Sequence, residues 1–96
     1  MSYDTLQVAI GADRVGIVTM NRPEVRNAMN TRMMTEMRDC FAGFYIDPDA
    51  AACLVLTGAP GGFCSGADLR ERKGMTDVAW RQQHAVVEQM VRAILE

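Results

Sequence analysis

The feature that most restricts the fold is a short apolar run that leads directly into a loop rich in glycine. The run CLVLT, residues 53–57, has no alternation of apolar and polar side chains, so it predicts a β-strand buried on both faces. The stretch that follows, GAPGGFCSGADLRER, residues 58–72, gathers glycines and then turns sharply polar. Glycines allow the chain to turn tightly, and a short helical turn is expected to begin at Ala67 and Asp68. A buried strand, a tight loop and a helix in this order indicate an α/β fold.

Three segments before this strand have recognisable patterns. Residues 6–10 and 15–20 are short β-rich runs separated by turn residues, which predicts an antiparallel hairpin. Between residues 31 and 46, apolar side chains recur at helical spacing, which predicts an amphipathic helix with Asn30 or Thr31 as its N-cap. Because a strand, a helix and a strand follow one another, we expect a right-handed crossover between parallel strands.

A second long helix is expected at the end of the chain, from Asp77 to the last residue, with Thr76 as its N-cap. Its predicted apolar stripe consists of Trp80, Val87, Val91, Ile94 and Leu95. We read its end as lacking a glycine, a proline or a basic final turn, one of which usually marks a natural helix end. We therefore expect residues 1–96 to be the N-terminal part of a longer domain, cut within this helix.

The composition excludes several classes of function. The chain is 49% hydrophobic and 23% charged, and its formal net charge of −2 offers no basic surface for nucleic acid or for an anionic membrane. No apolar run approaches the ~20 residues that span a bilayer, and the first residues lack the basic start of a signal peptide. The cysteines, Cys40, Cys53 and Cys64, are odd in number and lack paired spacing. We therefore expect reduced thiols in the cytoplasm, with Cys40 and Cys53 as small core residues.

Two familiar uses of a glycine-rich loop fit this loop poorly. Gly61 and Gly66 have the spacing of a phosphate-binding loop, but Ala67 and Asp68 stand where that motif needs lysine and a hydroxyl residue. Ser65 is one position out of register with the nucleophile motif G-x-S-x-G. No second group supports Cys64 as a reactive thiol, and the only histidine, His84, is expected to be a surface or packing residue of the last helix.

Two interpretations of the loop remain from local chemistry. The first is a plain turn between a strand and a helix, in which the glycines serve geometry alone. In the second, a helix start near Ala67 leaves backbone N–H groups unpaired, and such a group donates to a developing oxyanion. One donor of this kind is typically worth about 3–4 kcal/mol in a transition state.

Two segments together resemble the enoyl-CoA hydratase/isomerase (crotonase) superfamily. They are NRPEVRNAMN, residues 21–30, and LVLTGAPGGFCSGADLRE, residues 54–71, and the resemblance runs from residue 6 to at least Arg72. The start of the glycine loop, Gly58 followed by Gly61 and Gly62, is looser than the family pattern. The resemblance implies that residues 1–96 form the N-terminal ββαβ-loop-α portion of the crotonase (ClpP/crotonase-like) spiral fold.

The resemblance also implies a site. The Ala67 N–H corresponds to one of two backbone donors that bind a thioester carbonyl as it becomes an enolate. Its neighbours are expected to line the acyl-CoA path, and two residues of the first loop to contact the adenine and phosphopantetheine parts of CoA. The path residues are Gly66, Ala67, Asp68, Leu69 and Arg70, and the CoA contacts are Arg26 and Ala28.

Simpler interpretations of these side chains stay open. Asp68 is also expected to cap the short helix, Arg26 is equally a solvated loop arginine, and residues 70–73 are expected to form a solvated face.

As implied by the resemblance, the protein is an acyl-CoA-binding enzyme that hydrates 2-trans-enoyl-CoA, with a coenzyme A thioester as substrate and no metal or other cofactor. Full-length relatives form trimers or hexamers. The acid/base carboxylates and the second donor lie in later segments of the family, so we expect no activity from residues 1–96 alone. The alternative is a non-catalytic CoA-binding module or an inactive fragment.

Overall fold

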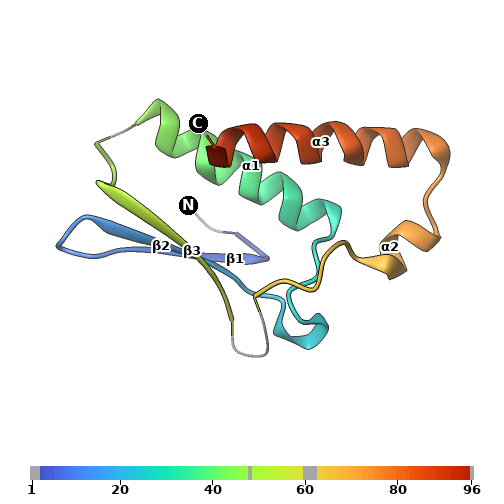
Figure 1. The fold of residues 1–96 in the computed structure, drawn as a ribbon, viewed down its shortest axis with the longest axis horizontal. Helices are drawn as coiled ribbons and strands as arrows, with labels where there is room; N and C mark the ends of the chain where they lie inside the picture. The colour runs from blue at the N-terminus through green and yellow to red at the C-terminus, as the bar shows by residue number, and fades with distance from the viewer. Residues whose placement is uncertain (1–2, 48, 60–62, 96) are drawn as a thin grey trace.

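The computed structural model describes residues 3–47, 49–59 and 63–95, and Figure 1 labels its strands and α-helices. In chain order the elements are β1 (Leu6–Ile10), β2 (Val15–Met20), the 3-10 helix η1 (Pro23–Val25), α1 (Thr31–Ile46), β3 (Cys53–Gly58), α2 (Leu69–Lys73) and α3 (Asp77–Leu95). The sheet forms one layer, and α1 and α3 lie on the same side of it (Figure 1). Gly61 and Gly62, which entered the comparison with phosphate loops and with the family pattern, lie outside the described residues.

The sheet has the strand order β1-β2-β3. β1 pairs with β2 in antiparallel register, with Leu6 opposite Met20, and β2 pairs with β3 in parallel register, with Val15 opposite Cys53. The predicted hairpin and the parallel pairing expected for the crossover are therefore confirmed. Arg14 closes the hairpin turn at a positive φ of 65°, and its N–H donates to the carbonyl of Gly11 at 2.9 Å.

Helix α1 supplies most of the core. Asn30 is its N-cap, because the Asn30 side chain accepts a hydrogen bond from the Met33 N–H at 2.9 Å. The helix packs one apolar face toward the sheet, and methionine dominates the residues buried there, as flexible side chains that fill an irregular interior. The buried core consists of Leu6, Val18, Met20, Met33, Met34, Met37, Cys40, Phe41 and Met90. The predicted helix bounds and the core position of Cys40 are confirmed.

Strand β3 corrects a prediction. It was expected to be buried on both faces, but Cys53 is exposed and Val55 is 44% exposed. The reason is its position: β3 is an edge strand, and α1 and α3 cover only one face of the sheet (Figure 1). The expectation of Cys53 as a core residue is wrong for the same reason.

Helix α3 packs against α1, and the Thr76 hydroxyl accepts from the Ala79 N–H at 3.1 Å, which confirms the predicted N-cap. Its predicted apolar stripe is confirmed in part, since Val87 and Ile94 pack against the core. The buried residues of α3 are Gln83 and Met90, whereas Trp80, Val91 and Leu95 are 46%, 43% and 80% exposed. The cause is that α1 covers one side of α3, where Val86, Val87, Met90, Ala93 and Ile94 meet the core, whereas Trp80, Val91 and Leu95 lie outside the contact.

The end of α3 also differs from expectation, because Arg92 lies in its last turn and gives that turn a basic residue. Among the described residues, no helix combines the length and the hydropathy needed to cross a membrane.

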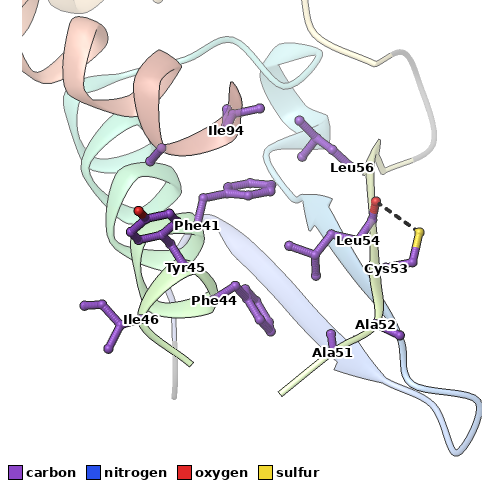
Figure 2. Close-up of a pocket in the computed structure, with 11 residues that line it drawn as sticks. Phe41, Phe44, Tyr45, Ile46, Ala51, Ala52, Cys53, Leu54, Leu56 and Ile94 are labelled. Carbon is purple, nitrogen blue, oxygen red and sulfur yellow. Dashed lines mark hydrogen bonds between the residues drawn. The ribbon is translucent and has the colours of Figure 1, made fainter. Parts of the chain in front are cut away.

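A groove of about 940 Å³ opens where the sheet and the helices diverge, between β3 and the C-terminal parts of α1 and α3 (Figure 2). Figure 2 shows Phe41 and Phe44 extending from α1 toward Leu54 and Leu56 on β3. Its lining residues are Phe41, Phe44, Tyr45, Ile46, Ala51, Ala52, Cys53, Leu54, Leu56, Ala93 and Ile94. We refer to these residues as the apolar groove. None of them carries a charge.

Candidate functional site

The first half of the candidate site is the loop between β2 and α1. This loop closes on itself, because the Asn27 N–H donates to the Arg22 carbonyl at 2.8 Å and the Asn27 Oδ1 accepts from the Arg22 N–H at 2.8 Å. Arg26 and Asn27 both have a left-handed backbone, with φ of 55° and 57°. Asparagine tolerates that conformation better than most residues, and here its side chain is completely buried. The sharp turn presents the carbonyls of Arg26 and Met29 to a second loop.

The second half is the segment 63–68, which runs beside the first loop. The Ser65 N–H donates to the Arg26 carbonyl at 3.1 Å, and Met29 forms an isolated parallel bridge with Ala67. Two short backbone hydrogen bonds make this bridge: the Met29 N–H donates to the Gly66 carbonyl at 2.7 Å, and the Asp68 N–H donates to the Met29 carbonyl at 2.9 Å. The residues that the sequence placed in two separate motifs are therefore paired in space.

The bridge fixes the direction of the Ala67 N–H. In a trans peptide the carbonyl and the following N–H point in opposite directions, and no described peptide bond is cis. Since the Gly66 carbonyl points to Met29, the Ala67 N–H points away from the first loop. Within the described part of the chain, this N–H donates no hydrogen bond, although Ala67 is half-buried. An unpaired, aimed backbone donor is the central feature of the site.

Gly66 makes this geometry possible. Its φ of +107° is a conformation that residues with a side chain rarely adopt. A β-carbon at Gly66 would meet no atom within 4 Å, so the constraint is the backbone angle and not lack of space.

Asp68 is the N-cap of α2, which confirms one of its two expected roles. Its Oδ1 accepts from the N–H groups of Arg70 and Glu71 at 3.0 and 3.3 Å. The hydrogen bond from the Glu71 N–H and the contact with Arg22 outweigh desolvation and hold the pKa of the Asp68 carboxyl below its usual range.

The helix therefore starts at Leu69, later than the Ala67 start expected from the sequence, and Ala67 precedes the cap. The Ala67 N–H is left unpaired by the bridge to Met29 and not by a helix end.

Arg22 joins the two halves of the site, although no role was predicted for it from the sequence. Its Nη1 donates to the Ala28 carbonyl at 2.6 Å and lies 3.1 Å from Oδ2 of Asp68. The two side chains are only 16% and 13% exposed, so water screens this ion pair less than one on the open surface. The sequence signal that could have indicated this ion pair was the presence of Arg22 in one motif and Asp68 in the other.

Glu71 corrects another prediction, because it does not belong to a solvated face. Its Oε1 accepts hydrogen bonds from the Thr31 N–H and hydroxyl at 2.8 and 2.7 Å, and from the Gln83 amide at 2.6 Å. Glu71 thus ties α2 to the start of α1 and to α3. Arg72 also contacts Gln83, at 3.2 Å, while Arg70 and Lys73 are exposed as predicted.

The remaining predicted contact residues surround the bridge. Arg26 is exposed, and its guanidinium has no partner among the described residues. Ala28 is buried, with its carbonyl held by Arg22. Leu69, 77% exposed, and Arg70 lie on the first turn of α2 and extend into solvent. The structure therefore brings Arg26 and Ala28 beside residues 65–68, with Leu69 and Arg70 next to them in the chain.

The side chains that suggested a nucleophile are not arranged as one. The Ser65 hydroxyl donates to the Val25 carbonyl at 3.4 Å. His84 lies on the exposed side of α3, stacked on Trp80 at a centroid distance of 5.4 Å and 3.5 Å from the Glu88 carboxylate. The expectation of a surface histidine is confirmed. Among the described residues, no group of three or more histidine, cysteine or acidic side chains has an arrangement that would hold a metal ion.

Comparison with known proteins identifies the relatives of this chain. A family model for enoyl-CoA hydratase/isomerase matches residues 11–95. The protein named probable enoyl-CoA hydratase echA8 from Mycobacterium leprae (strain TN) is 40% identical over 103 aligned positions, which cover 98% of this chain and 39% of that protein. The 1,2-epoxyphenylacetyl-CoA isomerase of Escherichia coli (strain K12) is 44% identical over 55 positions, 57% of this chain and 21% of that protein.

The fold agrees with these similarities. The solved structure of the enoyl-CoA hydratase from Mycobacterium smegmatis matches with a TM-score of 0.85 and 25% identity, over 94% of this chain and 35% of that chain. The predicted fold class, an α/β N-terminal portion of the crotonase fold, is confirmed. This chain thus spans 39% and 21% of the lengths of the two curated relatives named above. The chain belongs to the enoyl-CoA hydratase/isomerase family.

Proposed function

We propose that this chain is the acyl-CoA-binding part of an enzyme that hydrates 2-trans-enoyl-CoA, and that the Ala67 N–H donates to the thioester carbonyl. The observation that carries the proposal is the unpaired Ala67 N–H, which the Gly66–Met29 hydrogen bond aims away from the first loop. Family membership supports the substrate class, since the relatives named above are a hydratase and an isomerase of CoA thioesters.

The proposed role of Ala67 follows from where charge develops. When water adds to the β-carbon of an enoyl thioester, it gives one proton to a base, and the electron pair of the double bond moves toward the carbonyl and places negative charge on its oxygen. Protonation of the α-carbon then restores the thioester. A donor already aimed at that oxygen stabilises the intermediate without reorganisation, by about 3–4 kcal/mol for one well-placed N–H.

The exposure of Arg26 supports CoA binding near the bridge. Arg26 is exposed and its guanidinium is unpaired among the described residues, so it is available to a CoA phosphate. The Ala28, Leu69 and Arg70 positions adjoin the bridge and are proposed to line the path of the acyl-pantetheine arm.

We further propose that the complete enzyme needs no metal or other cofactor, that it assembles as a trimer or hexamer, and that it works in the cytoplasm.

For residues 1–96 alone we propose binding without turnover. The two carboxylates closest to Ala67 in sequence are already committed: Asp68 caps α2 and pairs with Arg22, and Glu71 accepts three hydrogen bonds. Neither is free to act as a general acid or base. We propose that the acid/base carboxylates and the second oxyanion donor come from outside residues 1–96. A non-catalytic CoA-binding module is the second candidate, and the same observation favours it.

A titration of the ¹⁵N-labelled chain tests the proposal. Crotonyl-CoA is compared with S-butyl-CoA, a thioether that keeps the CoA part and lacks the carbonyl. We expect both ligands to shift the Arg26 amide and only crotonyl-CoA to shift the Ala67 amide strongly downfield. Equal shifts at Ala67 would refute the carbonyl contact, and no binding of either ligand would refute acyl-CoA binding by this chain.

Turnover is followed in parallel by the loss of the enoyl absorbance of crotonyl-CoA. Hydration at rates typical of an enzyme would contradict the proposal that the acid/base groups lie outside residues 1–96.

A further inference from the structure

We propose that Arg22 is the positioning residue of the Ala67 donor: it clamps the two loops together on both sides of the Met29–Ala67 bridge and thereby fixes the direction of the Ala67 N–H. Its consequence for catalysis rests on the proposed function. Its structural part, the clamp itself, is testable on the free chain.

The contacts of Arg22 flank the bridge. On the first loop, Nη1 donates to the carbonyl of Ala28, the residue before Met29. On the second loop, the same nitrogen contacts the carboxylate of Asp68, the residue after Ala67. A single guanidinium therefore binds the immediate neighbour of each bridged residue.

The bridge needs such a clamp because it is short. It has two backbone hydrogen bonds, both on Met29. In the described part of the two loops, Ser65 adds one backbone bond to the Arg26 carbonyl and a long one, 3.4 Å, from its hydroxyl to the Val25 carbonyl. Isolated pairs of short extended segments are weakly stable in water. Charge-assisted hydrogen bonds are stronger than neutral ones, and partial burial of Arg22 and Asp68 limits their screening by salt.

Arg22 is itself anchored, which allows it to act as a fixed point. Its main-chain N–H and carbonyl both bind Asn27, and the carbonyl also accepts from the Val25 N–H at 3.1 Å. The comparison with Arg32 is informative: Arg32 forms ion pairs with Asp4 and Glu36, but its side chain is 61% exposed and it lies outside both loops.

The direction of the donor matters because hydrogen bonds weaken steeply as the donor angle departs from linear. A productive oxyanion donor must be held within about 0.5 Å and 10–20° of its target. If the Gly66–Ala67 peptide tilts, the Ala67 N–H remains present but no longer points at the carbonyl oxygen. Arg22 therefore acts through the direction of the Ala67 N–H.

The first experiment measures amide hydrogen exchange in the free chain, with Arg22→Met as the main variant. We expect the Met29 and Asp68 amides to exchange at least about tenfold faster than in the wild type, because the charge-assisted contacts that hold the bridge are lost. The matched control is Arg32→Met, which removes an arginine from two ion pairs elsewhere and should leave both amides within about twofold.

The amide of Met37, in the middle of α1, reports global stability in the same spectra. Unchanged exchange at Met29 and Asp68, or acceleration no greater than at Met37, would overturn the clamp. If Arg22→Met does not fold, Arg22→Lys and Asp68→Asn replace it: each keeps a polar side chain and weakens one part of the contact, and each should accelerate the same two amides selectively.

The second experiment reads the donor directly, through the infrared carbonyl band of bound crotonyl-CoA at saturating chain. In the wild type we expect this band below that of the free ligand. In Arg22→Met it should move back toward the free value, even for ligand that is fully bound.

If Arg22 had a merely structural role, Arg22→Met would lower the affinity for crotonyl-CoA but leave the carbonyl band of the bound ligand at its wild-type position. That result would overturn the positioning role. If the wild-type chain does not bind crotonyl-CoA, the proposed function fails, whereas the exchange result still decides whether Arg22 clamps the loops.

Discussion

The two ends of this molecule are stabilised in different ways. At the loop end, residues 22–31 and 63–71 are joined by directional polar contacts, in which Arg22, Asp68 and Glu71 each bind more than one partner. At the other end, the apolar groove separates β3 from α1 and α3, and uncharged side chains line it. Figure 1 shows the whole fold with both ends, and Figure 2 shows the groove end in close-up.

This difference indicates which end of the molecule is held in one specific arrangement. Hydrogen bonds depend on angle as well as distance, so the loop end has one arrangement that satisfies its donors and acceptors. Apolar contacts are nearly non-directional and gain stability in proportion to the area they bury. An open groove leaves part of that gain unrealised. We therefore expect the loop end to be rigid in the free chain and the groove to tolerate substitution.

The largest expected effect tests the groove against the closed core, with two truncations on the same helix. Met37→Ala removes a side chain that is 2% exposed and should lower the free energy of unfolding by about 2–5 kcal/mol. Phe44→Ala removes a larger side chain, but one that is half-buried at the groove, and should lower it by about 1 kcal/mol. Urea unfolding followed by circular dichroism measures both. Equal losses would mean that the groove is closed in solution.

The next effect concerns Glu36, a polar anchor that fastens the start of β1 to α1. Its carboxylate accepts from the Asp4 N–H and from the N–H and hydroxyl of Thr5. Burial raises the pKa of the Glu36 carboxyl, but these hydrogen bonds and the one from Arg32 outweigh it and hold the pKa below its ordinary value. Glu36→Gln should lower the free energy of unfolding at neutral pH by about 1.5–3 kcal/mol.

The pH dependence of stability tests how much the polar contacts of Glu36 and Asp68 contribute. Glu36 and Asp68 both have a lowered pKa in the folded state, so the unfolded chain binds more protons in acid. Their stabilisation is fully present above the ordinary carboxyl pKa of about 4 and is lost as the pH falls through the folded-state values. The urea midpoint should therefore fall in acid, and fall less in Glu36→Gln and Asp68→Asn. An unchanged slope in both variants would contradict the polar origin of this stability.

A smaller effect is expected from Gly66→Ala, which tests the backbone of the loop end. An alanine at a φ of +107° is strained, so the free energy of unfolding should fall by about 1–2 kcal/mol. Gly74→Ala is the matched control, since Gly74 has a φ of −94° and a β-carbon there also meets no atom within 4 Å. We expect no loss of stability at Gly74. If the two variants behave alike, the backbone angle of Gly66 does not constrain the loop.

The smallest effect is expected from His84→Ala, which lies outside both regions. The His84 side chain is 58% exposed and stacks on an exposed Trp80, so the free energy of unfolding should change by no more than about 0.5 kcal/mol. Thermal unfolding measures it. A larger loss would mean that the His84 side chain is packed in solution and not exposed.

The sequence predicted most of the local structure. The hairpin, the bounds of α1, the Thr76 cap and the Asp68 cap all depend on contacts within a few residues, so their patterns are visible in the chain itself. The burial of both faces of β3 was wrongly predicted, and so was the burial of Trp80, Val91 and Leu95 on α3. An apolar side chain can be buried, but the sequence does not say which neighbour would cover it.

In the candidate site, too, the features within one segment could be predicted, and the contacts between segments could not. The two motifs, and with them the family, could be read from residues 21–30 and 54–71, because the residues that carry the resemblance are close in sequence within each motif. The pairing of Met29 with Ala67, the clamp by Arg22 and the contacts of Glu71 join residues that are far apart in the chain. Only the tertiary structure determined these contacts, because each joins segments that come together in space. The local sequence preferences of one segment do not predict which other segment it will contact.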